Sequence, residues 1–108
     1  MNALQAYLRI AWACRTPFVL LLDRRYSPRP TQEVQAAVAQ FKRGPYIPEV
    51  YDCDDFAATL KGELGHAVGI AMNHKHAWNV ALCTDGVWHI EPQTGEFRKR
   101  KWTLFVMI

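Results

Sequence analysis

The sequence has few cysteines, and their number and spacing argue against two common stabilising frameworks. Cys14, Cys53 and Cys83 are far apart in a chain of 108 residues, and no two of them form a CxxC pair. An odd, widely spaced set is not a disulfide framework and lacks the ligand spacing of a zinc site. We therefore expect reduced thiols, a cytoplasmic location, no metal and no other cofactor.

Long apolar runs are also missing. No segment approaches the roughly 20 apolar residues that a membrane-spanning helix needs. The apolar stretch at the start of the chain is interrupted by Arg9 and Arg15, and it lacks a basic opening followed by a clean apolar run. We therefore expect neither a signal peptide nor a membrane partner.

The sequence has no strong excess of one charge. Thirteen Lys and Arg against ten Asp and Glu give a formal net charge of +3, less than a dedicated nucleic-acid binder carries, so nucleic acid is not an expected partner. The basic residues nevertheless include a consecutive run from Arg98 to Lys101. We interpret this run as a solvated strand edge guarded by charge, with an anionic partner as the alternative.

Apolar side chains are abundant, at 50% of the residues, and 12% of the residues are aromatic. This composition predicts one ordered domain spanning residues 1–108. Apolar spacing predicts three helices: the first over residues 3–14, the second from an N-cap at Thr31 to about residue 41, and the third over residues 53–64. An early strand is predicted at residues 18–22. Strand patterns follow over residues 67–72, 76–82, 87–91 and 102–108. Helices followed by an antiparallel meander predict an α+β fold.

Two further expectations concern particular segments. Pro45 and Pro48 are expected to hold residues 46–51 extended. The final strand, 102–108, is very apolar. If its edge were exposed, it would pair with a second copy of the chain, so a homo-oligomer formed through this strand is one expectation.

Cys53 is the first candidate for chemistry, because it falls at the predicted first turn of a helix. The partial positive charge and free backbone N–H groups of a helix N-terminus favour a thiolate and are suited to receive an oxyanion. Nearby negative charge disfavours a thiolate, and three aspartates flank this cysteine: Asp52, Asp54 and Asp55. Asp52 also has a structural explanation as the N-cap. A packed, unreactive cysteine is the alternative interpretation.

A thiol nucleophile needs a base, and the base needs an orienting acceptor. His76 opens one predicted strand and Glu91 ends the next. If the intervening hairpin loop has an even number of residues, both side chains point to one face and are diagonal neighbours. An odd loop would separate them. His89 shares the face of Glu91 and competes as its imidazole partner, and a surface histidine and a surface glutamate remain the simpler interpretation.

Together these segments resemble the transglutaminase-like superfamily, a branch of the papain-like cysteine enzymes. Asp52-Cys53-Asp54-Asp55-Phe56-Ala57 is similar to the Asp-Cys-acid-Asp-aromatic-Ala motif of bacterial transglutaminase-like cysteine peptidases. His76-Ala77-Trp78 resembles the His-Ala-Trp strand of that superfamily. Trp88-His89-Ile90-Glu91-Pro92 resembles its Trp-x-x-x-Asp-Pro element, with Glu in place of Asp and with Trp88 one residue nearer the acid. The resemblance covers residues 52–93.

The resemblance implies a papain-like fold, with helices packed on an antiparallel sheet. It also implies a triad of Cys53 as nucleophile, His76 as base and acid, and Glu91 as orienting carboxylate. The substrate-contacting and oxyanion candidates are Asp52, Trp78, Asn79 and Gln93. Asn79 is also a fallback orienter, although strand alternation points it away from His76. Trp78 is either a cleft wall or a core residue.

Three functions follow as hypotheses. The first is a small cysteine hydrolase or acyl-transfer enzyme that acts on an amide bond of a peptide, a protein or a cell-wall crosslink. The second is a non-catalytic binding module that keeps the papain-like scaffold. The third is a metal site built from Cys53, His74, His76 and an acid, which the spacing does not favour.

Overall fold

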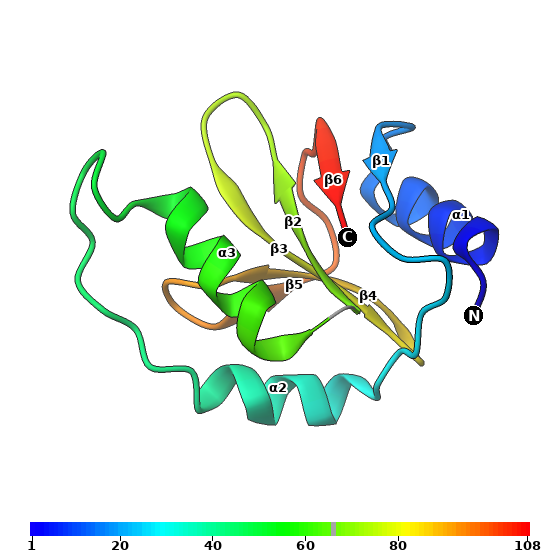
Figure 1. Ribbon diagram of the computed structural model, residues 1–108, viewed down its shortest axis with the longest axis horizontal. Coiled ribbons are helices and arrows are strands. Elements are labelled where there is room, and N and C mark those ends of the chain that lie inside the picture. Colours follow the sequence, from blue (N-terminus) through cyan, green and yellow to red (C-terminus); the bar gives the residue numbers. More distant parts are fainter. Residues whose placement is uncertain (66) are drawn as a thin grey trace.

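The computed structural model describes residues 1–65 and 67–108. Within these residues the chain forms three helices and six strands (Figure 1). In chain order they are α1 (Ala3–Cys14), β1 (Val19–Leu20), α2 (Thr31–Ala39), α3 (Cys53–Leu64), β2 (Val68–Met72), β3 (Ala77–Cys83), β4 (Gly86–Glu91), β5 (Glu96–Arg98) and β6 (Phe105–Met107). The predicted α+β class is confirmed.

The six strands form one sheet in the order β1-β6-β2-β3-β4-β5. Neighbouring strands are antiparallel except β1 and β6, which run parallel. The β2–β3–β4 meander forms its centre. The predicted strands at 67–72, 76–82 and 87–91 are therefore confirmed, and each of their ends lies within one residue of the observed end.

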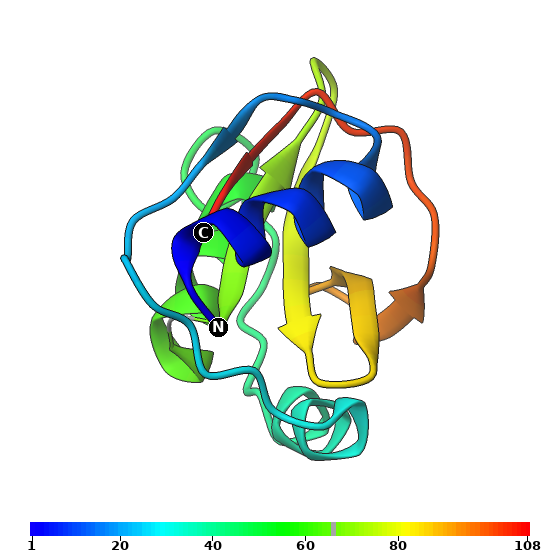
Figure 2. The ribbon, with the colours of Figure 1, turned by 90° about the vertical axis from the view of Figure 1, so that its right-hand side faces the viewer.

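The helices cover both faces of the sheet. Helix α1 lies across one face, whereas α2 and α3 lie on the other (Figures 1 and 2). Strand β3 contributes alternate residues to the two cores. Trp78, Val80 and Leu82 pack with residues of α1, whereas Ala81 and Cys83 pack with residues of α2 and α3. This strand is buried on both sides, which explains its nearly continuous apolar sequence.

The C-terminal strand does not offer a free edge, so the condition for pairing a second copy of the chain through it is not met. Strand β6 pairs with β2 on one side and with β1 on the other. The close approach of the chain end to β2 depends on Gly69, because a β-carbon there would lie 2.5 Å from the Met107 carbonyl oxygen. The edges of the sheet are β1 and β5 instead. Strand β5 was not predicted, and it begins the segment that carries the basic run.

Two local predictions need correction. Thr31 is the first residue of α2 and Pro30 is its N-cap. The backbone N–H of Thr31 donates to the side chain of Asp85, at 3.0 Å, so a residue of the β3–β4 turn caps this helix. The segment 46–51 is not simply extended. Ile47 and Tyr51 form an isolated bridge that closes a turn, in which Glu49 has a φ of 60°.

None of the described helices combines the length and the apolar character that a membrane span needs.

Candidate active site

The N-terminus of α3 positions Cys53, which is the first residue of the helix and is half-buried. Asp52 is the N-cap, and its backbone N–H donates to Oδ2 of Asp55 at 3.0 Å, as in a capping box. Tyr51, just before the cap, packs edge-on against Phe56 with ring centroids 4.9 Å apart. The predicted helix start is confirmed, and Asp52 has a structural role in fixing it.

An acidic cluster surrounds this helix start. The carboxylates of Asp52, Asp54 and Asp55 lie within 4.8 Å of one another. The pKa of Asp52 is raised, chiefly by a hydrogen bond with Asp54 and further by partial desolvation and by repulsion from both neighbours. Its negative charge therefore develops at a higher pH than that of an isolated aspartate.

The β3–β4 hairpin satisfies the parity condition on which the His76–Glu91 pairing depends. Cys83 pairs with Gly86, which leaves a two-residue loop, and Asn79 pairs with Ile90. Continuing this register by one step places Glu91 opposite Trp78. His76, immediately before β3, is then the diagonal neighbour of Glu91, within reach of long side chains.

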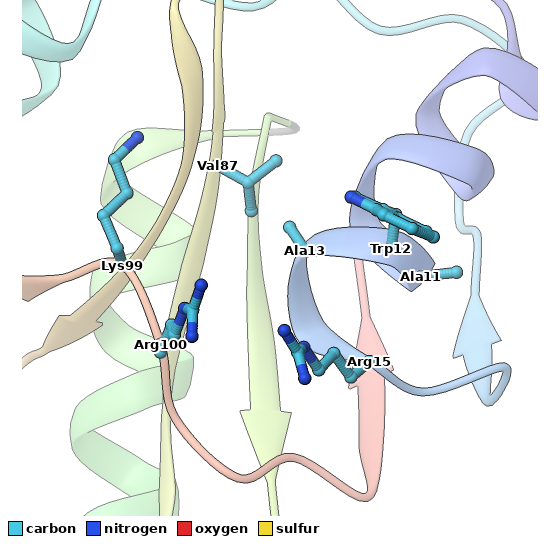
Figure 3. Close-up of a pocket in the computed structure, with 7 residues that line it drawn as sticks. All are labelled: Ala11, Trp12, Ala13, Arg15, Val87, Lys99 and Arg100. Atoms are coloured by element: carbon cyan, nitrogen blue, oxygen red, sulfur yellow. The ribbon is translucent and has the colours of Figure 1, made fainter.

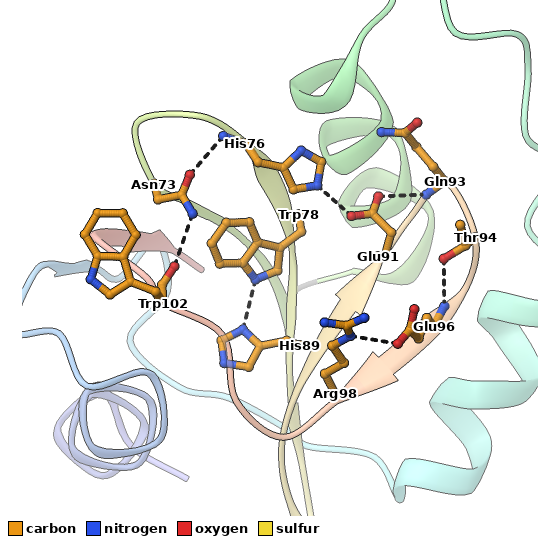
Figure 4. A network of polar contacts seen from close by, with 10 residues as sticks. All are labelled: Asn73, His76, Trp78, His89, Glu91, Gln93, Thr94, Glu96, Arg98 and Trp102. Carbon is orange, nitrogen blue, oxygen red and sulfur yellow. Dashed lines mark hydrogen bonds and ion pairs between the residues drawn. The ribbon is translucent and has the colours of Figure 1, made fainter.

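His76 and Glu91 are in direct contact. Nε2 of His76 lies 2.6 Å from Oε2 of Glu91, and the two side chains are 27% and 21% exposed (Figure 4). The other carboxylate oxygen of Glu91 accepts from the backbone N–H of Gln93 at 3.2 Å. Both oxygens are therefore engaged, and Gln93 contributes through its backbone. Because Nε2 faces Glu91, Nδ1 is the ring nitrogen left for another partner.

Trp78 supports the imidazole ring of His76. The two rings stack with centroids 5.9 Å apart and an interplanar angle of 19°. The indole N–H of Trp78 donates to Nδ1 of His89 at 2.9 Å (Figure 4). On the Trp78 ring lies Nζ of Lys101, 4.6 Å from the centroid. Trp78 is fully buried, so it is a core residue that holds His76 and not an open cleft wall.

His89 does not compete for Glu91. Its Nδ1 accepts from Trp78, and an indole nitrogen is a donor only, so Nδ1 carries no proton. Burial lowers the pKa of His89 to about 4, with a further contribution from the positive charge of Lys101. His89 is therefore a neutral, buried residue that fixes the orientation of Trp78.

Asn79 lies on the opposite face of β3, as strand alternation predicts. It is fully buried. Its amide nitrogen donates to the carbonyl oxygen of Ala57 in α3 at 2.8 Å and to that of Gly69 in β2 at 3.0 Å. Asn79 therefore ties the helix that carries Cys53 to the sheet, and it offers no exposed group to a substrate or to His76.

The three cysteines differ in exposure. Cys14 and Cys83 are buried, and Cys53 is half-buried. Burial raises the pKa of the Cys14 thiol to about 12 and also raises the pKa of Cys83. Cys53 is therefore the cysteine best placed to meet a ligand. Among the described contacts the structure joins His76 to Glu91, but it includes no hydrogen bond between the Cys53 thiol and His76. Such contacts are often loose without substrate.

Comparisons with known proteins identify the fold. No family model matches the chain, and no curated protein matches it. Among solved structures, the chain is similar to the "PSL1a-E64 complex", with a TM-score of 0.76 and 23% sequence identity. The match covers 97% of this chain and 48% of that chain. The fold is papain-like, and the chain spans about half the length of the matched structure.

Proposed function

We propose that the chain is a cysteine hydrolase or acyl-transfer enzyme that acts on an amide bond. In this proposal Cys53 is the nucleophile, His76 the general base and acid, and Glu91 the orienting carboxylate. The observation that carries it is the 2.6 Å contact between Nε2 of His76 and Oε2 of Glu91. A charged acceptor behind an imidazole fixes its tautomer and stabilises the imidazolium formed during reaction.

The proposed chemistry proceeds in two steps. Nδ1 of His76 takes the proton of the Cys53 thiol, and the sulfur attacks the carbonyl carbon of the amide. The C–N bond then breaks, the amine leaves with the proton from His76, and a thioester remains on Cys53. Water or a second amine then attacks the thioester and loses a proton to His76. The C–S bond breaks, and the Cys53 sulfur regains the proton from His76. Attack by water releases a carboxylic acid (hydrolysis), and attack by an amine releases a new amide (transfer).

The helix N-terminus supplies the oxyanion site in this proposal. Backbone N–H groups in the first turn of α3 have no partner within the helix and point along its axis. They carry partial positive charge where the carbonyl oxygen of the substrate becomes negative. The nearby hydroxyl of Tyr51 is engaged elsewhere, since it lies 2.7 Å from Oγ1 of Thr59. The backbone donors are therefore the main oxyanion ligands that we propose.

Cys14 and His89 form a second cysteine–histidine combination on the α1 side of the sheet, but their chemistry is unfavourable. A thiol with a pKa of about 12 is almost entirely protonated at neutral pH. The imidazole, with a pKa of about 4 and with Nδ1 held by Trp78, is a weak base. Neither group is suited to nucleophilic catalysis, so the proposal rests on Cys53.

The matched structure is a complex with E64, an inhibitor of papain-like cysteine peptidases, and this compound provides the test. The intact protein is incubated with E64, and its mass is measured. We expect one adduct on the native chain and on a Cys83→Ser control, and none on Cys53→Ser. No adduct on the native chain would favour the binding-module hypothesis. An adduct that persists in Cys53→Ser would show that another cysteine reacts and would contradict Cys53 as the nucleophile.

A further inference from the structure

A groove lies between the end of α1 and the segment that follows β5. It has a volume of about 800 Å³ and is lined by residues of both segments and by Val87 (Figure 3). Arg15 and Arg100 approach it from opposite sides, and Lys99 and Trp12 complete its walls (Figure 3). A second hollow, of about 340 Å³, shares Arg15 and Arg100 and extends to Trp102.

The described residues that line this groove carry positive charge without neighbouring carboxylates to neutralise it. No Asp or Glu is among the described residues that line either hollow. Arg98, just outside, pairs with Glu96 at 2.7 Å. The ammonium groups of Lys99 and Lys101 lie over Trp88 and Trp78, at 4.0 and 4.6 Å from the ring centroids. Arg15 and Arg100 have no comparable partner among the described contacts, so both guanidinium groups remain available.

Exposed aromatic surface accompanies these free cations. Trp12 is 87% exposed and Trp102 is 61% exposed. An exposed indole beside an uncompensated guanidinium is typical of a binding surface, because Trp and Arg are the residues most enriched at energetically important contacts. A guanidinium binds a carboxylate through two parallel hydrogen bonds. The residue types therefore suit a ligand that carries both carboxylates and apolar groups.

The second hollow reaches a residue that contacts the loop before His76. Trp102, which lines this hollow, packs its ring against His74, with centroids 5.4 Å apart. The amide nitrogen of Asn73 donates to the Trp102 carbonyl at 3.3 Å, and its oxygen accepts from the backbone N–H of His76 at 2.9 Å (Figure 4). Asn73 thus links Trp102, at the end of the second hollow, to the backbone of the proposed catalytic base.

We propose that this groove binds an acidic segment of a polypeptide substrate, with Arg15 and Arg100 as its carboxylate ligands. The inference rests on the proposed function, since a chain that is cleaved or acylated near His76 would extend from there into the groove. A polypeptide is favoured over a single-stranded nucleic acid because the thiol and imidazole act on acyl groups. The modest net charge of +3 also does not suit binding to a phosphate backbone.

Binding is measured by fluorescence anisotropy on the full chain carrying Cys53→Ser, so that the result does not depend on turnover. The probe is a labelled ten-residue peptide of alternating Glu and Leu, compared with its Gln–Leu counterpart and with a labelled oligothymidylate. We expect the acidic peptide to bind at least tenfold more tightly than the Gln peptide. We also expect it to bind more tightly than the oligothymidylate.

The variant Arg15→Gln with Arg100→Gln should weaken binding of the acidic peptide about tenfold or more. Arg24→Gln with Lys42→Gln removes the same charge from exposed positions elsewhere, and it should change binding less than twofold. Near-ultraviolet circular dichroism checks that both double variants are folded. The single variant Arg100→Gln, in an exposed segment, should show a smaller loss of peptide affinity.

Equal losses of affinity in the two double variants, or tighter binding of the oligothymidylate, would overturn the proposal. A failed E64 reaction with intact peptide binding would instead count against the proposed function alone.

Discussion

The side chains of His76 and Glu91 meet at 2.6 Å across the β3–β4 hairpin. The two-residue loop pairs odd-numbered residues of β3 with even-numbered residues of β4, and even with odd, so His76 and Glu91 point to the same face of the hairpin. The glutamate side chain is long enough to reach its diagonal neighbour on the other strand. Both groups are about three-quarters buried, so solvent weakens their interaction only in part. This pair is the best-defined part of the candidate site.

Glu91→Gln keeps the shape of the side chain and removes its charge. If Glu91 orients His76, the rate of Cys53 alkylation or of substrate turnover should fall about tenfold to hundredfold, the equivalent of one charged hydrogen bond. Glu96→Gln is the matched control, because Glu96 lies on the neighbouring strand and pairs with the exposed Arg98. Equal rates in the two variants would contradict the orienting role.

His89 should make the stability of the protein depend on pH. Its folded pKa of about 4 lies below the unfolded value of 6.5, so the unfolded chain binds a proton first as the pH falls. The contribution is therefore fully present above pH 6.5 and is lost as the pH falls toward 4, about 3 kcal/mol in all. Urea unfolding at pH 7, 5.5 and 4 measures it. His89→Gln, which keeps an acceptor for Trp78, should lose this part of the slope, and an unchanged slope would be inconsistent with a buried neutral imidazole.

Asn79→Ala should destabilise the protein without a direct effect on chemistry. The substitution leaves the carbonyls of Ala57 and Gly69 without a buried donor, which costs about 2 kcal/mol. Denaturant unfolding measures the loss, and the alkylation rate of Cys53 is measured under conditions where the variant is folded. A large loss of rate with full stability would instead indicate that Asn79 contacts the reacting groups.

The three thiols should react in two classes. In the native protein one thiol, Cys53, should react quickly with an aromatic disulfide reagent, and Cys14 and Cys83 should react only after unfolding in guanidinium. Cys14 and Cys83 react slowly because they are buried, and burial also raises the pKa of the Cys14 thiol to about 12. Cys53→Ser should show no fast phase. A fast phase that survives in this variant would mean that a buried cysteine opens readily to solvent.

Much of the fold was predictable because its signals are local. The Asp52 cap, the four-residue spacing of Phe56, Leu60 and Leu64, and Gly65 define α3 by themselves. These features need only the residue period of a helix. The Thr84-Asp85-Gly86 sequence predicted a hairpin but not the length of its loop, and the Cys83–Gly86 pairing in the structure decides that His76 and Glu91 share a face.

What escaped prediction depends on contacts between distant segments. The N-terminus of α2 is capped by Asp85, more than 50 residues away in sequence. The interior position of β6 depends on pairing with β1, a two-residue strand with little pattern of its own. Within the basic run 98–101, only the structure shows which side chains have partners, because these partners are Glu96, Trp78 and Trp88. None of these relations leaves a periodic signal in the sequence.

The proposed activation of Cys53 by His76 is tested most directly by the rate of Cys53 alkylation with iodoacetamide at pH 7, followed by mass spectrometry of the peptide that contains Cys53. We predict a rate at least tenfold above that of an unfolded control, falling to the control value in His76→Gln, because a neighbouring base is what activates the thiol. A rate equal to the control in the native chain, or a fast rate unaffected by His76→Gln, would contradict the proposed pair.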